Sequence, residues 1–305
     1  MIFNPGSGKN DESPLQLMDI IKAMQTAEFE PEAYLLQPEC DLKAVVREAA
    51  AQGIQMIVVC GGDGTISATA RAMQGLDITL GIIPTGTQNK ISYSLGIPKD
   101  IPKAINILRN GQHSKMDIGM ITCGEKSMPF LEICSIGLFS SLFQSSDEIQ
   151  HGNIAKIGDF LATLATFPPS EISFLLDDGR RIENRGHVVL VTNMPYVIRH
   201  YQVGPASSFR DGLLDILIFE DISKLELIGY MLQQPESVRL EDHRIVHLQA
   251  RRVEIDTKPA MSVMADGDEL GEGLVQIEVK PEAISVMIGT DLPNDREKSG
   301  ESFEG

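Results

Sequence analysis

The first 120 residues alternate between two hydrophobic periods. Apolar residues three and four positions apart predict amphipathic helices, and short continuous apolar runs bounded by turns predict buried strands. Helices and strands that alternate in this way are typical of a parallel sheet, so we expect a doubly wound α/β domain. The predicted helices begin at Ser13, at Asp41 and near Ile66, and the predicted strands are Glu32–Leu36, Ile54–Cys60 and Ile78–Ile83.

Beyond Asp117 the pattern changes to short β-like runs that are separated by turns. Two helical stretches, Ile154–Phe167 and Ser223–Gln233, interrupt these runs, and prolines end both of them. β-like runs at this regular spacing predict an all-β sandwich domain. The clearest predicted strands are Phe130–Ile136, Ile172–Leu176, His187–Asn193, Leu213–Phe219, Val253–Ile255, Val275–Val279 and Ile284–Ile288.

The change of pattern predicts two domains in this chain of 305 residues. Residues 1–118 form the predicted α/β domain, with 286–292 as a candidate segment that rejoins it, and residues 119–290 form the predicted sandwich. The segment 291–305 carries five acidic and two basic residues, which predicts a flexible tail. Only Met1–Asn4 precede the first turn, and a strand this short indicates that the natural chain begins upstream.

Composition narrows the classes of function. The formal net charge of −17 argues against a nucleic acid partner, because phosphate backbones are bound by basic clusters, and it opposes general attraction to an anionic membrane. Four cysteines lie scattered in apolar runs without a CxxC pair, which predicts buried, reduced thiols in a cytoplasmic protein. The sequence shows neither a signal peptide nor an apolar stretch of about 18 residues that could span a membrane.

Three turns rich in glycine and hydroxyl groups each follow an apolar strand: Asn4–Lys9, Gly61–Thr65 and Pro84–Asn89. In a doubly wound sheet the carboxyl ends of the strands share one edge, where ligands bind. Glycine lets a backbone approach a ligand closely, and a helix N-terminus attracts anions. The turns therefore favour a phosphate site, and Asp63 indicates a divalent ion between carboxylate and phosphate. The alternative is a tight structural turn in which Asp63 bonds its own backbone.

Two common phosphate motifs do not fit this sequence. A Gly-Lys pair lies in the first turn, but a P-loop requires glycine where the chain has Phe3 and serine or threonine where it has Asn10. A Rossmann fingerprint requires a third glycine where the chain has Asp11 or Ser67. Dinucleotide redox chemistry therefore loses support.

Five motifs follow one another along the chain: Asn4-Pro5-x-Ser7-Gly8, Gly61-Gly62-Asp63-Gly64-Thr65, Pro84-x-Gly86-Thr87-x-Asn89 with Leu95-Gly96-Ile97-Pro98, Asp211-Gly212-Leu213-Leu214-Asp215, and Asp266-Gly267. In this order they resemble the diacylglycerol kinase catalytic domain superfamily, which includes bacterial lipid kinases, sphingosine kinases and ceramide kinases and is related to NAD kinases. The resemblance covers nearly the whole chain. It implies an N-terminal nucleotide-binding α/β domain similar to those of NAD kinases and phosphofructokinases, a C-terminal β-sandwich, and ATP-dependent phosphorylation of a lipid hydroxyl.

The resemblance also implies roles for individual residues. Asp268 is the implied catalytic base, and Asp63 is the implied catalytic carboxylate that positions Mg²⁺ on ATP. A second, structural Mg²⁺ would be held by the side chain of Asp211 and the carbonyl oxygens of Ser208 and Leu213, and the alternative is a plain Asp-Gly turn. The implied ATP-binding residues are Asn4, Ser7, Gly8, Lys9, Gly61, Gly62, Asp63, Gly64, Thr65, Thr87 and Asn89.

Two positions depart from the family's pattern. Relatives usually carry an acid directly after the asparagine of the third turn, where this chain has Lys90, and a cation cannot ligate magnesium. Lys90 either contacts phosphate directly or points away from it. In the second case this chain simply lacks the acid that relatives carry at this position. The family's base is a glutamate directly after Asp-Gly, where this chain has Asp268 followed by Glu269. Asp268 can accept a hydroxyl proton if the backbone lies closer, and Glu269 can do so if the turn differs.

Two further groups of residues carry weaker signals. His243 and His247 are four positions apart, but the residues between them are β-like and no third ligand follows, so surface or sheet histidines are favoured over a zinc site. Arg180, Arg181 and Arg185 form a basic cluster, which either contacts anionic headgroups or belongs to a solvated hairpin.

We therefore expect a cytoplasmic lipid kinase that uses ATP and Mg²⁺ to phosphorylate a diacylglycerol-like lipid, as an enzyme of phospholipid metabolism. Its association with the membrane surface is expected to be peripheral. The alternatives are a kinase for a sphingoid base, an isoprenoid alcohol or NAD, and a catalytically silent nucleotide-binding regulator. A homodimer is compatible with the sequence, which does not determine the oligomeric state.

Overall fold

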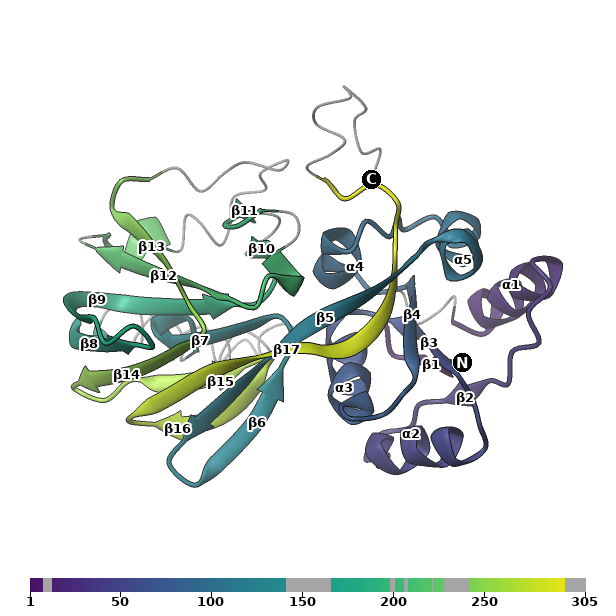
Figure 1. The fold of residues 1–305 in the computed structure, drawn as a ribbon, viewed down its shortest axis with the longest axis horizontal. Coiled ribbons are helices and arrows are strands. Elements are labelled where there is room, and N and C mark those ends of the chain that lie inside the picture. The colour runs from purple at the N-terminus through teal and green to yellow at the C-terminus, as the bar shows by residue number, and fades with distance from the viewer. Residues whose placement is uncertain are drawn as a thin grey trace. The chain divides into compact units, whose positions relative to one another are not determined.

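A computed structural model describes residues 1–7, 13–140, 166–197, 201–205, 208–220, 222–227 and 242–293. The chain forms two compact units, both drawn in Figure 1. The first unit contains Met1–Asp117, Pro205–Arg210 and the residues from Pro281 onward, and the second contains Ile118–Gly204 and Asp211–Lys280. Gly8, Lys9, most of the predicted helices Ile154–Phe167 and Ser223–Gln233, and the predicted tail beyond Pro293 lie outside the described residues.

The first unit is built on a parallel sheet with the strand order β2 (Tyr34–Leu35), β1 (Ile2–Phe3), β3 (Met56–Gly61), β4 (Thr79–Pro84) and β17 (Val275–Ile288). Five of the six residues in β3 and in β4 are buried, as continuous apolar runs in a covered parallel sheet require. The C-terminal end of β17 joins this sheet, with Ser285 opposite Thr79. The chain changes direction across the sheet between β1 and β3, and ligands bind at such a switch point in open α/β sheets.

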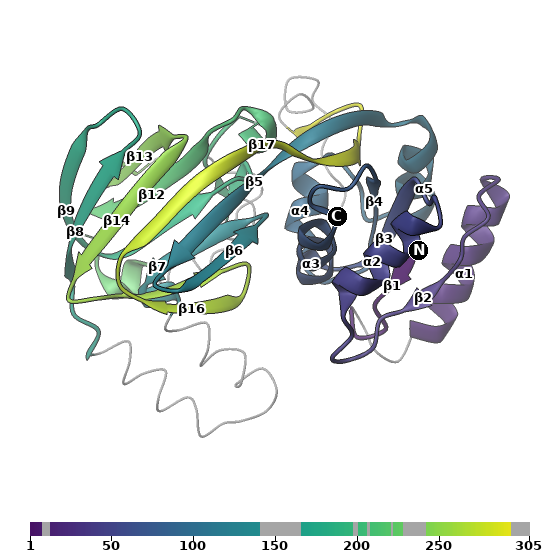
Figure 2. The same ribbon diagram turned by 60° about the horizontal axis from the view of Figure 1, so that its bottom comes forward.

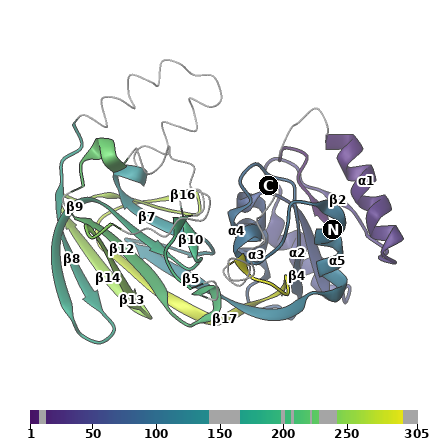
Figure 3. The ribbon, with the colours of Figure 1, turned by 90° about the horizontal axis from the view of Figure 1, so that it is seen from above.

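Helices cover both faces of this parallel sheet (Figure 3). On one face, α1 (Ser13–Thr26) and α5 (Ile101–Asn110) share an apolar cluster with β1, β3 and β4. On the other face lie α2 (Leu42–Ala51), α3 (Asp63–Met73) and α4 (Lys90–Ser94). The predicted cap of α2 is present, since Asp41 accepts the N–H of Ala44 at 3.1 Å. The predicted doubly wound α/β fold is therefore confirmed.

The second unit is a β-sandwich. One sheet has the order β6 (Lys126–Phe130), β5 (Gln112–Cys123), β17, β14 (Arg252–Lys258), β8 (Ser170–Leu176) and β9 (Arg181–Thr192). Figure 2 shows β14, β17, β5 and β6 side by side. The other sheet has the order β16 (Asp268–Glu272), β15 (Ser262–Ala265), β7 (Ile133–Gly137), β9, β12 (Leu214–Glu220) and β13 (Ile245–Ala250). The short strands β10 (Tyr196–Val197) and β11 (Tyr201–Gln202) also belong to this unit, whereas the 3₁₀ turn Ser208–Arg210 belongs to the first unit.

The inner faces of the two sheets enclose one apolar core. Inward residues alternate with outward ones along each strand, as in Val253 and Ile255 of β14 and Val189 and Val191 of β9. β9 takes part in both sheets, because its residues Arg181–Gly186 pair with β8, whereas residues from Gly186 onward pair with β12 and from Val188 onward with β7. This period of two on both sheets confirms the predicted sandwich.

Several elements differ from the sequence-based prediction. The runs Val275–Val279 and Ile284–Ile288 belong to one strand, β17, which includes the more exposed residues between them even though Glu282 has φ of 52°. The run Phe130–Ile136 is wrong as one strand, since a turn separates the end of β6 from β7. The helix α5 and the strands β5, β13, β15 and β16 have no counterpart among the predicted elements. β16 has one buried residue, Leu270, so its apolar signal is weak.

The described residues include no helix that combines the length and the apolarity needed to cross a membrane. All four cysteines are free thiols, and three of them are buried as predicted, whereas Cys40 is half-buried. Burial raises the pKa of Cys60 to about 12, and burial together with the nearby charge of Asp266 raises the pKa of Cys134. Thiolate chemistry at these two buried residues is therefore disfavoured.

Candidate active site

The three predicted turns lie together at the carboxyl ends of β1, β3 and β4, and hydrogen bonds join them in pairs. Asn4 Nδ2 donates to Thr65 Oγ1 at 2.7 Å, which joins the first turn to the second. Ser7 Oγ lies 3.0 Å from Thr85 Oγ1, which joins the first turn to the third. The N–H of Thr85 donates to the carbonyl of Gly61 at 3.1 Å and closes the set. We call the described residues of these turns the three-turn cradle: Asn4–Ser7, Gly61–Thr65 and Thr85–Asn89.

The second and third turns of the cradle touch through two glycines. A Cβ atom placed on Gly86 would lie 2.4 Å from the Cα of Gly62 and 3.1 Å from its nitrogen. A side chain on Gly86 would therefore push the two turns apart, and glycine is the residue that allows their backbones to approach.

Asn89 shapes the third turn from inside. Its backbone lies in the left-handed region, with φ of 56°, which asparagine tolerates better than most residues. Its Oδ1 accepts the N–H of Gly86 at 3.0 Å, and its Nδ2 donates to the carbonyl of Gly86 at 2.7 Å. Asn89 is 3% exposed, and both the oxygen and the nitrogen of its amide form hydrogen bonds within the turn. Its side chain therefore stabilises the conformation of this loop. Contact between Asn89 and ATP stays a prediction.

Asp63 links the second turn to the third. It is the first residue of α3, where the helix dipole stabilises a negative charge. One of its carboxylate oxygens accepts the N–H of Ile91, in the first turn of α4, at 2.9 Å. The structure thus differs from the alternative in which Asp63 bonds its own backbone. Mg²⁺ is commonly held by one or two carboxylates together with substrate phosphates, and the half-buried Asp63 fits that donor set.

The cradle has the composition of an anion site. The first-turn amides of a helix have no partner within the helix, and α3 begins inside the cradle. Hydroxyl groups surround this helix end, with Ser7, Thr65 and Thr85 bonded to one another's turns and Thr87 exposed. Lys90, which departs from the family pattern, is the half-buried first residue of α4. Amides, hydroxyls and a helix N-terminus together suit a phosphate group.

Thr85 is the cradle residue that sequence reasoning missed. It is 7% exposed, and its Oγ1 contacts Ser7 while its N–H contacts Gly61. The available signal was the run Pro84-Thr85-Gly86-Thr87, in which two threonines flank a glycine. The sequence alone does not distinguish Thr85 from Thr87. What distinguishes Thr85 is its contact with Ser7, which lies in the turn after another strand.

Asp268 and Glu269 lie in the second unit, at the start of β16. The turn before them has φ of 46° at Asp266 and 90° at Gly267, which is the pattern of a two-residue type I′ hairpin turn. Asp268 pairs with Ala265 and Glu269 pairs with Met264, so the two acids lie on opposite faces of the hairpin. Both residues are exposed. Asp268 is thus the first strand residue after the turn.

The three predicted ligands of a structural metal are close in sequence. Ser208 belongs to the first unit, and Asp211 and Leu213 belong to the second. Asp211 Oδ1 accepts the N–H of Leu213 at 2.9 Å, which is the geometry of an Asp-Gly turn. Within the described part of the chain, His, Cys, Asp and Glu side chains form no group of three or more that could hold a metal ion. A structural Mg²⁺ at Asp211 stays a prediction.

The two histidines of the second unit lie where the β-like pattern predicts. His247 lies on β13, and its Nε2 is 2.7 Å from Asp215 Oδ1. The side chain of His243 is 93% exposed. His247 is thus a sheet histidine and His243 a surface one.

The predicted basic cluster is interleaved with acidic residues. Arg185 on β9 lies directly opposite Glu171 on β8, and Arg180 Nε lies 2.5 Å from Asp178 Oδ2. Acids directly across a strand pair offset the charge of the arginines. This arrangement favours the solvated hairpin over contact with anionic headgroups.

Comparison with known proteins identifies the family. The model of the diacylglycerol kinase catalytic domain matches residues 1–121, and that of the YegS C-terminal NAD kinase beta sandwich-like domain matches residues 147–288. A protein of Bacillus subtilis named diacylglycerol kinase is 27% identical over 274 residues, which is 88% of each chain. One of the same name from Staphylococcus carnosus is 22% identical over 276 residues, which is 89% of each chain.

A solved structure shares the fold. The crystal structure of a diacylglycerol kinase from Bacillus anthracis aligns with a TM-score of 0.72 at 21% identity, over 95% of this chain and 96% of that chain. The two family models together span most of this chain, in the order α/β unit and then sandwich. The chain therefore belongs to the diacylglycerol kinase catalytic domain family of lipid kinases.

Proposed function

We propose that this protein is a lipid kinase that transfers the γ-phosphoryl group of ATP to the hydroxyl of a diacylglycerol-like lipid. The observation that carries the proposal is the three-turn cradle, in which α3 begins among hydroxyl groups of the turns that follow three strands. Membership of the family supports phosphoryl transfer from a nucleotide, and relatives named diacylglycerol kinase support the choice of acceptor.

In the proposed nucleotide site, the cradle binds the phosphates of ATP. Backbone amides of the turn around Gly62 and hydroxyls such as Thr87 would contact phosphate oxygens, and glycine would let them approach. Asp63 would hold Mg²⁺. When bound, this ion would neutralise negative charge on the phosphates. The proposed nucleotide contacts comprise Asn4, Ser7, Gly8, Lys9, Gly61, Gly62, Asp63, Gly64, Thr65, Thr87 and Asn89.

In the proposed transfer, Asp268 accepts the proton of the lipid hydroxyl as its oxygen attacks the γ-phosphorus. The bond between that phosphorus and the β,γ-bridging oxygen breaks, and ADP leaves. The products are the phosphorylated lipid, ADP and the proton. We also propose that the enzyme acts in the cytoplasm and meets its lipid peripherally, since a charge of −17 opposes general attraction to anionic membrane.

An ATP-turnover assay with a panel of acceptors tests this function. The panel contains diacylglycerol, sphingosine, a long-chain isoprenoid alcohol and NAD, each with Mg²⁺ in a neutral detergent micelle or in buffer. We expect ADP release and labelled phospholipid with diacylglycerol. Transfer to another acceptor alone would replace diacylglycerol as the substrate class. ATP binding without transfer to any acceptor would support a nucleotide-binding regulator and contradict the kinase proposal.

A further inference from the structure

We propose that Asp266 is a positioning residue for the kinase reaction, whose carboxylate fastens the β15–β16 turn to the Leu131–Ile133 segment and so places Asp268. The inference rests on the proposed function, in which Asp268 is the base. All of these residues belong to the second unit. Sequence reasoning treats Asp266 as part of an Asp-Gly turn and gives its side chain no task.

The carboxylate of Asp266 accepts hydrogen bonds from three consecutive backbone amides. Oδ2 accepts the N–H of Leu131 at 2.6 Å, and Oδ1 accepts those of Glu132 at 2.9 Å and Ile133 at 3.0 Å. The N–H of Asp266 itself donates to the carbonyl of Ile133 at 3.0 Å. Hydrogen bonds to an ionised acceptor are roughly twice as strong as neutral ones. The turn is therefore fastened to a segment that lies more than 130 positions away in the chain.

Other Asp-Gly turns of the same unit show that a turn does not need such an anchor. Asp178 accepts the N–H of Arg180 at 3.0 Å, and Asp211 accepts that of Leu213 at 2.9 Å. In both cases the carboxylate bonds the backbone two residues further along, which closes its own turn. In Asp266, by contrast, both carboxylate oxygens accept hydrogen bonds from a segment that is distant in the chain. This contrast points to a role beyond turn formation.

The segment that receives Asp266 is itself held from its other side. The carbonyl of Glu132 accepts Thr192 Oγ1 at 2.9 Å and the N–H of Asn193 at 3.2 Å. Thr192 is fully buried and Asn193 is 1% exposed, so these donors belong to the packed interior of the sandwich. The amides of Leu131, Glu132 and Ile133 thus lie on a platform that buried groups hold in place, and the carboxylate of Asp266 binds the β15–β16 turn to it.

The consequence concerns Asp268, which follows Asp266 by two residues. Asp268 is exposed, and in the ladder it pairs with Ala265, the last residue of β15. Besides the ladder to β15 and the bond from Lys126 Nζ to the carbonyl of Glu269 at 3.3 Å, the three amide bonds of Asp266 help to fix the position of this hairpin end. Because a misplacement of about 1 Å costs roughly 10²-fold in rate, a loosened turn should lower transfer without altering the chemistry of the base.

The test compares three variants of the full chain: Asp266→Asn, Asp268→Asn and Asp178→Asn. Asparagine retains the left-handed backbone and one acceptor oxygen at 266, but it sets an amide group against one of the three N–H donors. Asp178→Asn alters another Asp-Gly hairpin turn and is the matched control. The measurements are kcat and KM for ATP and diacylglycerol, the melting temperature, and hydrogen exchange at the amides of residues 131–133.

For Asp266→Asn we expect kcat to fall about 10- to 100-fold with KM for ATP unchanged, together with faster exchange at the 131–133 amides. Asp178→Asn should match the wild type in kcat. Asp268→Asn should lose transfer while the 131–133 amides keep their protection. A kcat for Asp266→Asn within twofold of the control would overturn the positioning role, even if Asp268→Asn is inactive.

The proposed function can fail separately. Full activity of Asp268→Asn would show that Asp268 is not the base, and a loss in Asp266→Asn would then contradict positioning through Asp268. A wild-type protein that transfers phosphate to no lipid would overturn both proposals, and hydrogen exchange would then report the anchor as a purely structural contact.

Discussion

The two units of the molecule hold their candidate site residues in different ways. In the first unit three turns bond one another, and the pairs Asn4–Thr65 and Ser7–Thr85 join residues 61 and 78 positions apart. In the second unit the candidate base lies on the exposed end of a single hairpin, and the carboxylate of Asp266 fastens that end to the platform at 131–133.

This difference corresponds to the chemistry proposed for each unit. Phosphate binding uses many backbone donors at once, so the cradle must keep its three turns in fixed positions relative to one another. Proton acceptance uses one carboxylate, whose position alone has to be set. We therefore expect a single substitution in the cradle to lower nucleotide affinity moderately, because other donors remain. A single substitution at the hairpin should lower kcat strongly, because it affects the one proton acceptor.

The largest effect is expected at Asp268. Asp268→Asn removes the proton acceptor and should lower kcat by roughly 10²- to 10⁴-fold, the usual range for general acid–base catalysis. ATP affinity should stay within a factor of two, because in the proposed reaction Asp268 contacts the lipid hydroxyl and the cradle binds the phosphates. Steady-state kinetics with diacylglycerol, together with ATP titration, measure both quantities.

Glu269→Gln is the control for this prediction. Glu269 is adjacent and also exposed, but it lies on the opposite face of the hairpin, paired with Met264. It should keep most of the wild-type kcat. The reverse result, with Glu269 essential and Asp268 dispensable, would assign the base to the other face. If neither substitution matters while lipid is still phosphorylated, the reaction has no side-chain base at this hairpin.

Asp63 should show an effect on nucleotide affinity. Asp63→Asn keeps an oxygen that can accept the N–H of Ile91 but removes the charge that would offset Mg²⁺. We expect affinity for Mg·ATP to fall about 10- to 100-fold, as the loss of about 1.5–3 kcal/mol from a charged contact implies. The melting temperature of the unliganded protein should stay close to that of the wild type.

Asp63→Ala separates the two roles of this side chain. It removes the charge and the hydrogen bond to Ile91 together, so it should also lower the free energy of unfolding by about 1 kcal/mol, as the loss of a helix cap does. Equal Mg·ATP affinity in wild type and Asp63→Asn would exclude Asp63 as the metal-binding carboxylate.

The sequence predicts the α/β unit well because its signals are local. Within the predicted strand Ile54–Cys60, the residues Ile57–Cys60 are buried and continuous, and Asp41 caps α2 where the pattern places it. The strands of the sandwich are harder to find, because β13 and β16 each have only one buried residue and are defined by their partners. Pairing across strands is a tertiary property, which periodicity does not contain.

The candidate site divides in the same way. The glycine-rich turns can be found from the sequence, since strand ends with glycine and hydroxyl residues are recognisable motifs. The contacts of Thr85 and Asp266 cannot, because their partners lie at Ser7 and at Leu131–Ile133. Both are side chains that act on backbone or turns far away in the chain, and no spacing rule connects them.

The contact between Gly62 and Gly86 tests how far the cradle depends on close packing. Gly86→Ala places a Cβ 2.4 Å from the Cα of Gly62, so the two turns must separate. We expect a loss of about 1–3 kcal/mol in the free energy of unfolding, as overpacking usually costs, together with weaker ATP binding. Gly64→Ala is the control, because a Cβ there meets nothing within 4 Å and the melting temperature should hold. Equal melting temperatures for both variants would contradict the close approach.

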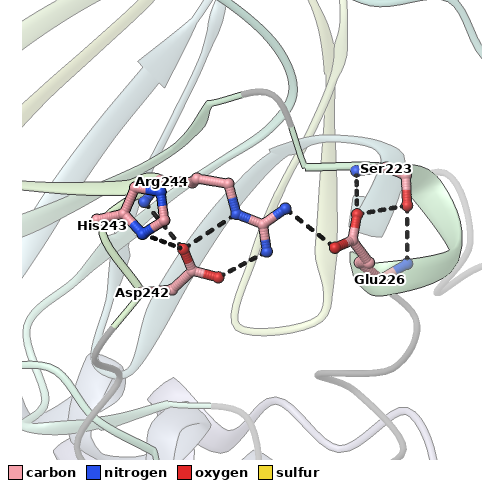
Figure 4. Close-up of polar contacts among 5 residues, drawn as sticks. All are labelled: Ser223, Glu226, Asp242, His243 and Arg244. Atoms are coloured by element: carbon pink, nitrogen blue, oxygen red, sulfur yellow. Dashed lines mark hydrogen bonds and ion pairs between the residues drawn. The ribbon is translucent and has the colours of Figure 1, made fainter.

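The smallest expected effect concerns residues that belong to neither candidate site, the ionic network of Glu226, Arg244 and Asp242 (Figure 4). Hydrogen bonds from Ser223 and the charge-assisted bond from Arg244 lower the pKa of Glu226 from 4.5 to about 2. A depressed carboxylate pKa stabilises the folded state above the unfolded pKa, and this contribution is lost as the pH falls. The contribution of Glu226 should thus be complete above pH 4.5 and should vanish near pH 2.

Thermal unfolding of wild type and Glu226→Gln at several pH values measures this contribution. The wild type should melt slightly higher than Glu226→Gln at pH 6, and the difference should shrink between pH 4.5 and pH 2, because protonation makes the two side chains alike in charge. The difference should be small, since the Glu226 side chain is 46% exposed and water screens the pair. Glu254→Gln is the control, because Glu254 is bonded to the neutral amide of Gln276. A difference for Glu226→Gln that is constant over this pH range would show that its charge does not stabilise the fold.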